Sequence, residues 1–436
     1  MKRSILLVLS IVLPVLSCIG REQTTDLRSL HREERDRYAR HVEADLRENI
    51  LPFWLEHARD RKRGGFFGQM NDGTGIEEDA TRGALLTTRI LWTFSAAYQR
   101  YPNPEYLEMA RWAYEDLLAR FWDKENGGLF WSIRADGAPL DTRKLIYVQS
   151  FGIYSLAEFH RATGDRQPLD HAIALYRVVE KHSRDRGNSG YFEEFSRDWT
   201  KSMERGAKGS AMGSLGQKSQ NVHLHLLEAY TNLLRAWPDQ QLRQDLSGLV
   251  DVLLGRIVDP SRHQLRLFFT ENWSPLSDVV SYGHDIEFSW LLVEAAEVLG
   301  DHALVRRARD EAVKIAAVTL SEGVDKDGAV LAEGDAGGVI NTAKDWWPQA
   351  EAAVGFFNAF EVSGDVAYLN ASLKSWDFIE RSLIDRKGGE WFVGVSKDGR
   401  VLSPVKFSFW KCPYHNGRAC MELLDRLKAI EAEPAR

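Results

Sequence analysis

Apolar residues recur along most of the chain at the three-and-four spacing of an amphipathic helix, and the helical stretches come in pairs. The first pair is ALLTTRILWTFSAAYQRY followed, after a Pro-Asn-Pro break, by PEYLEMARWAYEDLLARFW. Four further pairs lie at 147–183, 221–257, 284–320 and 346–384. A sixth pair is split between the two ends of the chain, with one helix near 27–60 and the other near 414–432.

A short turn-and-strand signal stands between successive pairs. Each copy begins with glycine or a polar turn and continues with large apolar residues, which is typical of a short strand. The copies are GGFFG at 64–68, GGLFW at 127–131, SGYFEEF at 189–195, HQLRLFF at 263–269, GAVLAEG at 328–334 and GGEWFVG at 388–394. The chain is therefore built from six similar units.

One helix pair cannot bury its apolar face alone, so units of this kind must stack on their neighbours. The pattern predicts an all-α fold, an (α/α)6 barrel formed by a toroid of six helix hairpins, with short β-hairpins on one rim. An open α-solenoid is the alternative, but the split sixth pair favours closure. We expect one catalytic domain over 19–436, with the first helix of each pair facing the interior.

Residues 1–18 do not belong to this pattern. Lys2 and Arg3 precede an apolar run that is typical of a signal peptide and too short for a membrane span. The end of the run, VLSC, resembles the lipobox of bacterial lipoproteins, which indicates lipidation of Cys18. We therefore expect an exported protein, either periplasmic or anchored in the outer membrane, with the cytoplasm as the alternative. A lipid at this position would be its one membrane contact.

Composition narrows the classes of function. The formal net charge is −7, which argues against nucleic acid as a partner, because nucleic-acid binding needs a basic surface. The other two cysteines, Cys412 and Cys420, are too few for a disulfide framework. No glycine-rich phosphate loop is present.

Polar and aromatic residues gather at the starts of the helices that should face inward. They are Arg89, Asn221, His223, His225, His284, Glu287, Trp290, Trp346, Trp347, Glu351, Trp410, Tyr414 and His415. A single histidine of this kind is most often a hydrogen-bonded core residue, and a single tryptophan is most often core. Arg89 is different, since a guanidinium among apolar neighbours is costly unless it is paired or lines a wet pocket. Unrelated core histidines also have no reason to repeat in one layer.

The segment SYGHDIEFSW at 281–290 admits two kinds of chemistry. His284 and Glu287 share a helix face at i and i+3, so both could reach one metal ion. Alternatively, His284 is a general base, because the positive end of the helix dipole disfavours the imidazolium form. Asp285 in the first turn should partly oppose that effect.

The motifs RILWTFSAAY, QNVHLHLLEAY, SYGHDIEFSWLLVEA, DWWPQAEAAVGF and FWKCPYHNGRACMELL resemble those of the cellobiose 2-epimerases, in the N-acylglucosamine 2-epimerase superfamily. The resemblance covers essentially the whole chain after the signal peptide, and it implies an (α/α)6 barrel. It also implies a reaction without metal or other cofactor, in which the reducing-end glucose of cellobiose or a related β-linked disaccharide is epimerised at C2. A monomer is expected.

Residue by residue, the resemblance implies that His284 and His415 transfer the proton, one on each face of the sugar. His225 and Arg89 would stabilise the enediolate. The implied sugar-binding and supporting residues are Glu287, Glu351, Trp347, Trp410, Asn221, Trp290 and Tyr147.

Other functions remain open at this point. A mannose isomerase and an N-acylglucosamine 2-epimerase share the fold. A glycoside hydrolase needs two carboxylates across the scissile bond, which fits a histidine-rich centre less well. A non-catalytic glycan-binding lipoprotein would need the tryptophans but not the histidines. The Gly- and Ser-rich segment 196–221 is expected to form a loop over the mouth of the barrel.

Overall fold

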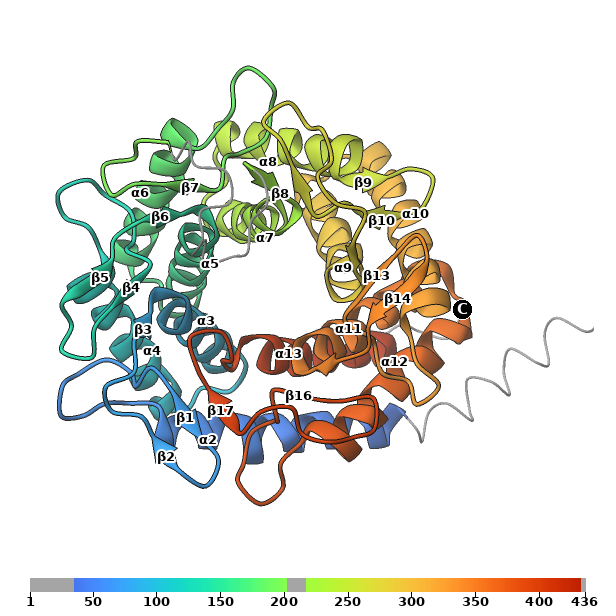
Figure 1. Cartoon of the computed structure of the whole chain (residues 1–436), viewed down its shortest axis with the longest axis horizontal. Helices are drawn as coiled ribbons and strands as arrows, with labels where there is room; N and C mark the ends of the chain where they lie inside the picture. Colours follow the sequence, from blue (N-terminus) through green and yellow to red (C-terminus); the bar gives the residue numbers. More distant parts are fainter. Residues whose placement is uncertain (1–34, 202–216, 433–436) are drawn as a thin grey trace, which may run out of the picture.

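A computed structural model describes residues 35–201 and 217–432, which form a closed ring of paired helices (Figure 1). The inner helices are α3 (Ala84–Arg100), α5 (Ile146–Thr163), α7 (Gln220–Ala236), α9 (Tyr282–Leu299), α11 (Trp346–Ser363) and α13 (Tyr414–Ala432). The outer helices are α2 (Leu51–His57), α4 (Pro104–Asp116), α6 (Arg166–His182), α8 (Gln240–Val252), α10 (His302–Val318) and α12 (Val366–Phe378). The predicted (α/α)6 barrel is confirmed.

Closure of the ring depends on the two ends of the chain. Helical residues 35–44 continue through the π-helical turn η1 (Asp45–Ile50) into α2, and this outer segment packs against α13. Helix α13 also packs against both α11 and α3. The split sixth pair is thus real, and the open solenoid is wrong.

The turns from inner to outer helices are encoded by short sequence signals. Gly164 and Gly300 end α5 and α9 with φ of 72°, a left-handed conformation that glycine adopts without strain. The next residues, Asp165 and Asp301, cap α6 and α10 by accepting backbone N–H bonds. A glycine followed by an aspartate therefore reverses the chain within two residues.

The outer helices lead into the predicted strand signals. Four of them end in π-helical turns, η2 (Leu117–Phe121), η3 (Leu253–Ile257), η4 (Thr319–Gly323) and η5 (Ile379–Leu383). All six signals then fold back to make a β-type pairing with the residues just after the outer segment. The pairs are Arg59 with Phe66, Trp122 with Leu129, Arg184 with Tyr191, Val258 with Leu265, Val324 with Val330 and Ile384 with Trp391.

The short strands lie at the end of the ring where the inner helices begin. They are β1 (Met70–Asn71), β2 (Gly75–Ile76), β3 (Arg82–Gly83), β4 (Ser132–Ile133), β5 (Pro139–Asp141), β6 (Lys144–Leu145), β7 (Glu194–Phe195), β8 (Lys218–Ser219), β9 (Val258–Asp259), β10 (Gln264–Leu265), β11 (Phe268–Phe269), β12 (Val280–Ser281), β13 (Glu333–Asp335), β14 (Gly338–Asn341), β15 (Lys344–Asp345), β16 (Gly394–Val395) and β17 (Val405–Phe407). The strand before each inner helix pairs with a hairpin strand of the following unit, as in β3 with β4 and β6 with β7. The pairing of β17 with β1 closes this circle too.

A buried cation stands two residues ahead of four inner helices and pairs with an aspartate in the preceding turn. Lys144 lies 2.9 Å from Asp123, and Lys218 lies 2.7 Å from Asp185. Arg82 and Lys344 make the equivalent pairs before α3 and α11. The strand before α9 has Val280 at this position, so the unit that carries His284 lacks the pair.

The apolar core fills the space between the inner and outer helices, with residues such as Trp54, Phe94 and Phe121 fully buried. Within the described ranges, no helix combines the length and apolar character that crossing a bilayer requires. The predicted signal peptide at 1–18, with Cys18, and most of the predicted loop at 196–221 lie outside the described residues.

Candidate active site

The predicted site residues occupy equivalent positions on the inner helices. Counted from the first residue of each helix, the second position holds Tyr147, Asn221, Trp347 and His415, and the sixth holds Arg89, His225, Glu287 and Glu351. These positions are about one turn apart and share a helix face. His284 is third in α9. The ring fold therefore gathers residues from six helices at the hairpin end of the barrel.

His284 and His415 contact the same indole. The ring centroid of Trp347 lies 4.6 Å from that of His284 and 5.6 Å from that of His415. The two histidines come from α9 and α13, on either side of α11 in the ring, and α11 carries the tryptophan. His284 and His415 are more than a hundred positions apart in the sequence and were predicted to act together. They thus lie in one cluster.

Each of three histidines has its Nδ1 held by a different neighbour. His415 Nδ1 lies 2.7 Å from Glu351, and His225 Nδ1 lies 3.0 Å from Glu228. His284 Nδ1 lies 2.9 Å from the hydroxyl of Ser281, the N-cap of α9. In the part of the chain that the structure describes, the Nε2 atoms of the three rings make no hydrogen bond, so they are available to a ligand.

The three histidines are neutral at pH 7. Burial and the repulsion of neighbouring imidazoles lower the pKa of His284 to about 3. Burial also lowers the pKa of His415 to about 3, although Glu351 opposes this, and burial lowers the pKa of His225. Asp285 does not oppose the effect as predicted, because burial raises the pKa of its carboxyl to about 8 and leaves it uncharged. Neutral imidazoles can accept a proton.

Arg89 is buried without a carboxylate. Its Nη2 donates to the hydroxyl of Tyr147 at 2.8 Å, and its guanidinium lies over Phe151 at 4.3 Å. No acidic side chain among the described residues forms an ion pair with it. The positive charge is thus placed in the layer of the histidines without being neutralised, as a group that stabilises a developing oxyanion needs to be.

Arg418 was not predicted, and it organises the carboxylates. Its Nη2 lies 2.7 Å from both Glu287 and Glu351, and its Nη1 contacts Glu228 and the hydroxyl of Tyr414. Burial would raise the pKa of Glu351, but Arg418 and His415 outweigh it and hold the value at about 2. Burial and the charge of Glu351 raise the pKa of Glu287 well above its usual range, so Glu287 holds a proton more tightly than Glu351 does.

A sequence signal for part of this network exists. His225 and Glu228 repeat the His-x-x-Glu spacing of His284 and Glu287 in the next inner helix. Arg418 stands three residues after His415, inside a motif that was recognised for its histidine alone. The hydrogen bonds differ, however, since His225 contacts its own glutamate whereas His284 contacts Ser281.

The remaining predicted residues fall at the edge of the cluster or beneath it. Trp410 is 38% exposed in the segment before α13, and its ring lies 6.1 Å from that of Tyr147. Asn221 is half-buried, and its Oδ1 has no hydrogen-bond partner among the described residues. Trp290 is buried and donates to Glu351 at 3.1 Å, so it supports a carboxylate.

His223 is a structural histidine. Its Nε2 accepts the backbone N–H of Tyr191 at 2.9 Å, and its Nδ1 lies 2.6 Å from the carbonyl of Ser219. Burial lowers its pKa to about 4. Both ring nitrogens form hydrogen bonds within the protein, so His223 is a hydrogen-bonded core histidine.

The described residues contain one group of potential metal ligands, and an arginine bonds to both of its carboxylates. Oxygen or nitrogen atoms of Glu287, Glu351 and His415 lie within 4.8 Å of one another. Arg418 Nη2 bonds to both carboxylates of this group. His284 is not a member of this group.

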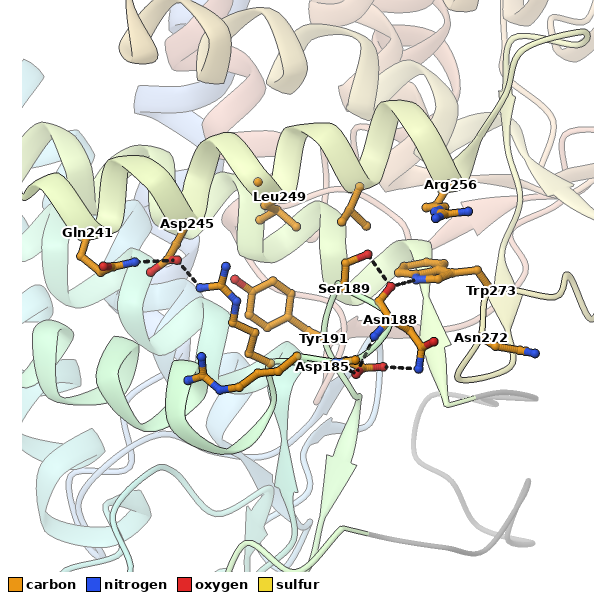
Figure 2. A pocket seen from close by; sticks show the side chains of 16 residues that line it. Asp185, Asn188, Ser189, Tyr191, Gln241, Asp245, Leu249, Arg256, Asn272 and Trp273 are labelled. Carbon is orange, nitrogen blue, oxygen red and sulfur yellow. Dashed lines mark hydrogen bonds and ion pairs between the residues drawn. The ribbon is translucent and has the colours of Figure 1, made fainter.

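Two large cavities have none of His225, His284 and His415 in their lining. A 740 Å³ groove on the outside of the ring runs between α8 and the turn 184–191, with Trp273 at one end (Figure 2). A 530 Å³ groove with corresponding residues, including Asp45 and Asp385, recurs in another unit. The repetition indicates a packing feature of the fold.

The third cavity, of 790 Å³, lies at the opposite end of the inner helices from the histidines. Ion pairs across it join neighbouring helices, such as Arg235 with Glu294 at 2.7 Å and Arg100 with Asp425. These ion pairs therefore link the inner helices to one another at that end of the ring.

Comparison with known proteins identifies the family. Residues 65–419 match the sequence model of the N-acylglucosamine 2-epimerase (GlcNAc 2-epimerase) family. A cellobiose 2-epimerase from Bacteroides fragilis is 44% identical over 385 residues, which are 88% of this chain and 97% of that protein. The N-acylglucosamine 2-epimerase of Bos taurus is 25% identical over 415 residues, 90% of this chain and 92% of that protein.

A solved structure agrees with the sequence comparison. The cellobiose 2-epimerase from Bacillus thermoamylovorans superposes with a TM-score of 0.85 at 37% identity, covering 90% of this chain and all of that one. With the closed ring, the clustered histidines and these matches together, the chain belongs to the N-acylglucosamine 2-epimerase family of carbohydrate epimerases.

Proposed function

We propose that this protein epimerises the reducing-end glucose of cellobiose and related β-linked disaccharides at C2, giving glucosyl-mannose. The observation that carries the proposal is the pair of neutral histidines, His284 and His415, against the ring of Trp347. The 44% identity to a cellobiose 2-epimerase supports this substrate over an N-acylated monosaccharide, whose relative is 25% identical.

The reaction begins when the sugar ring opens and exposes an aldehyde at C1. One imidazole accepts the proton on C2, and the electron pair moves into the C1 carbonyl to form a cis-enediolate. The second imidazole takes up a proton from solvent and donates it to C2 from the other face, the C1 carbonyl re-forms, and the configuration is inverted, while the first imidazole releases its proton to solvent. The reverse reaction exchanges the two roles.

Arg89 and His225 stabilise the enediolate oxygens in this scheme. Arg89 supports the assignment because it is charged, buried and free of a carboxylate partner among the described residues. His225 is uncharged, and with Nδ1–H donating to Glu228 its Nε2 is left as an acceptor, so it would accept the hydroxyl proton of the enediol and hold that form. Preorganised groups of this kind often supply the largest part of a rate enhancement.

Cellobiose in heavy water tests the proposal. Epimerisation predicts the C2 epimer with deuterium at C2, because the returning proton comes from a histidine that exchanges with solvent. His284→Ala and His415→Ala are each expected to abolish the product, while His302→Ala, an exposed histidine of α10, keeps wild-type turnover. Near-normal turnover in either site variant contradicts the assigned roles.

The same incubation separates the other functions. A ketose product identifies a mannose isomerase, free glucose a glycoside hydrolase, and an unchanged sugar a non-catalytic glycan-binding protein. Repeating it with N-acetylglucosamine tests the N-acylglucosamine alternative.

We also propose export, with lipidation at Cys18. The support is the sequence of residues 1–18 alone. Mass spectrometry of the protein from its native host is expected to find a lipidated Cys18 as the first residue, and a chain beginning at Met1 contradicts this.

A further inference from the structure

The fourth residue of several inner helices ties its helix to a neighbouring hairpin. Gln149 of α5 accepts the backbone N–H of Leu129 at 2.8 Å and donates to the carbonyl of the same residue at 2.9 Å. Gln349 of α11 makes the same two bonds to Val330, at 2.7 and 2.8 Å. In both cases the side chain is neutral and buried.

Asp285 occupies this position in α9, directly after His284. Its Oδ1 accepts the backbone N–H of Leu265 at 2.8 Å, so the first bond of the glutamine pattern is kept. Aspartate is one methylene shorter than glutamine, and its fully buried Oδ2 has no hydrogen-bond partner among the described residues. An ionised carboxylate with such an oxygen would be costly.

The charges around Asp285 do not offset that cost. Arg262, in the turn between β9 and β10, and Glu322, in η4, act on it with opposite signs. Tyr282 and His284, the other titratable groups of the helix start, are both uncharged at pH 7. The buried lysine of other units is replaced by Val280. Burial therefore dominates and raises the pKa of Asp285 to about 8.

We propose that Asp285 is a positioning residue that works in its protonated form, as the counterpart of Gln149 and Gln349, and that its ionisation limits activity at alkaline pH. This rests on the role proposed above for His284. An ionised Asp285 needs water or a donor at Oδ2, so the start of α9 loosens from the hairpin and the adjacent imidazole leaves its place. The negative charge also favours the imidazolium form of His284, which cannot accept a proton.

Asp285→Asn tests the proposal, because asparagine keeps the shape and the acceptor for Leu265 but cannot ionise. With a pKa near 8, wild-type kcat should fall about tenfold between pH 6 and pH 9. The Asn variant is expected to catalyse at pH 6 and to keep that rate at pH 9. Asp285→Ala leaves the N–H of Leu265 unpaired, and its kcat should be low at every pH with KM little changed.

Asp278→Asn is the matched control, since it removes an exposed carboxylate a few residues earlier and should leave the wild-type pH profile unchanged. An alkaline loss that persists in Asp285→Asn overturns the proposal. If the loss disappears in Glu287→Gln instead, Glu287 is the titrating group and the proposal is again wrong. Turnover of cellobiose by the wild type at pH 6 tests the proposed function separately.

Discussion

The three site histidines differ in the group that holds Nδ1, and this difference decides what each ring can do. A carboxylate beside Nδ1 fixes the tautomer and stabilises the imidazolium, as Glu351 does for His415 and Glu228 for His225. The hydroxyl of Ser281 can donate or accept, so His284 can adopt either tautomer. His415 is thus the ring better supported when it carries a proton.

Arg89 provides the prediction at this scale. Arg89→Met keeps much of the apolar contact with Phe151 but removes the charge. If the guanidinium acts on the enediolate, kcat should fall about 100- to 1000-fold while KM changes little. Steady-state kinetics with cellobiose measure both constants. A rise in KM at constant kcat would show that Arg89 only binds the sugar.

Some residues of the site could be predicted from the sequence and others could not. Arg89 could be singled out because a guanidinium is unusual among apolar neighbours, and the roles of His284 and His415 were implied by the resemblance of their motifs to those of the epimerases. The role of Arg418 could not, because it depends on carboxylates from three other helices that meet only when the ring closes. Distances between helices are not contained in the periodicity of any one of them.

At the scale of elements, helices and hairpins were predictable because apolar spacing and glycine turns report them directly. The buried side chains that join helices to hairpins were not predictable. The buried lysines before α5, α7 and α11 stand in polar stretches of sequence, where a lysine is usually solvated. The shared role of the fourth residue of the inner helices was not predicted either, because glutamine, histidine and aspartate all accept a backbone N–H there.

Replacing one of these fourth-position residues by another gives a prediction. His223→Gln puts into α7 the residue that α5 and α11 use, so the bond to the backbone N–H of Tyr191 can be kept. We expect wild-type turnover and a melting temperature within about 2 °C of wild type at pH 7. His225→Gln, two residues later in the same helix, should lose turnover at similar stability, as measured by calorimetry and an epimerisation assay. Equal loss in both variants would show that His223 also belongs to the active site.

At the scale of the whole molecule, the ring encloses ionisable groups that are rarely found in a protein interior from which water is excluded. Its centre is lined by inner helices whose polar residues are needed for chemistry, and the contacts between repeats leave further acids buried. Asp45 and Asp116, on outer segments, have pKa values raised by burial to about 7 and about 6. The fold therefore carries buried histidines that resist gaining a proton and buried aspartates that resist losing one.

These two sets make stability fall on both sides of an intermediate pH. His223, His284 and His415 have folded pKa values near 4, 3 and 3, below the unfolded value of 6.5, so their contribution is complete above pH 6.5 and is lost as the pH falls through the folded values. Asp45, Asp116 and Asp285 have folded values above the unfolded 3.8, so their contribution is complete below pH 3.8 and is lost as the pH rises through about 6 to 8.

The melting temperature should therefore be highest near pH 5 to 6 and lower by at least about 3 °C at pH 9. Calorimetry at constant ionic strength measures this, and Asp285→Asn should recover part of the alkaline loss while leaving the acid side unchanged. A melting temperature that rises steadily to pH 9 would mean that the buried aspartates are ionised in the folded ring. In that case their oxygens must be reached by water, and the walls between the repeats are more open than the packing of the helices shows.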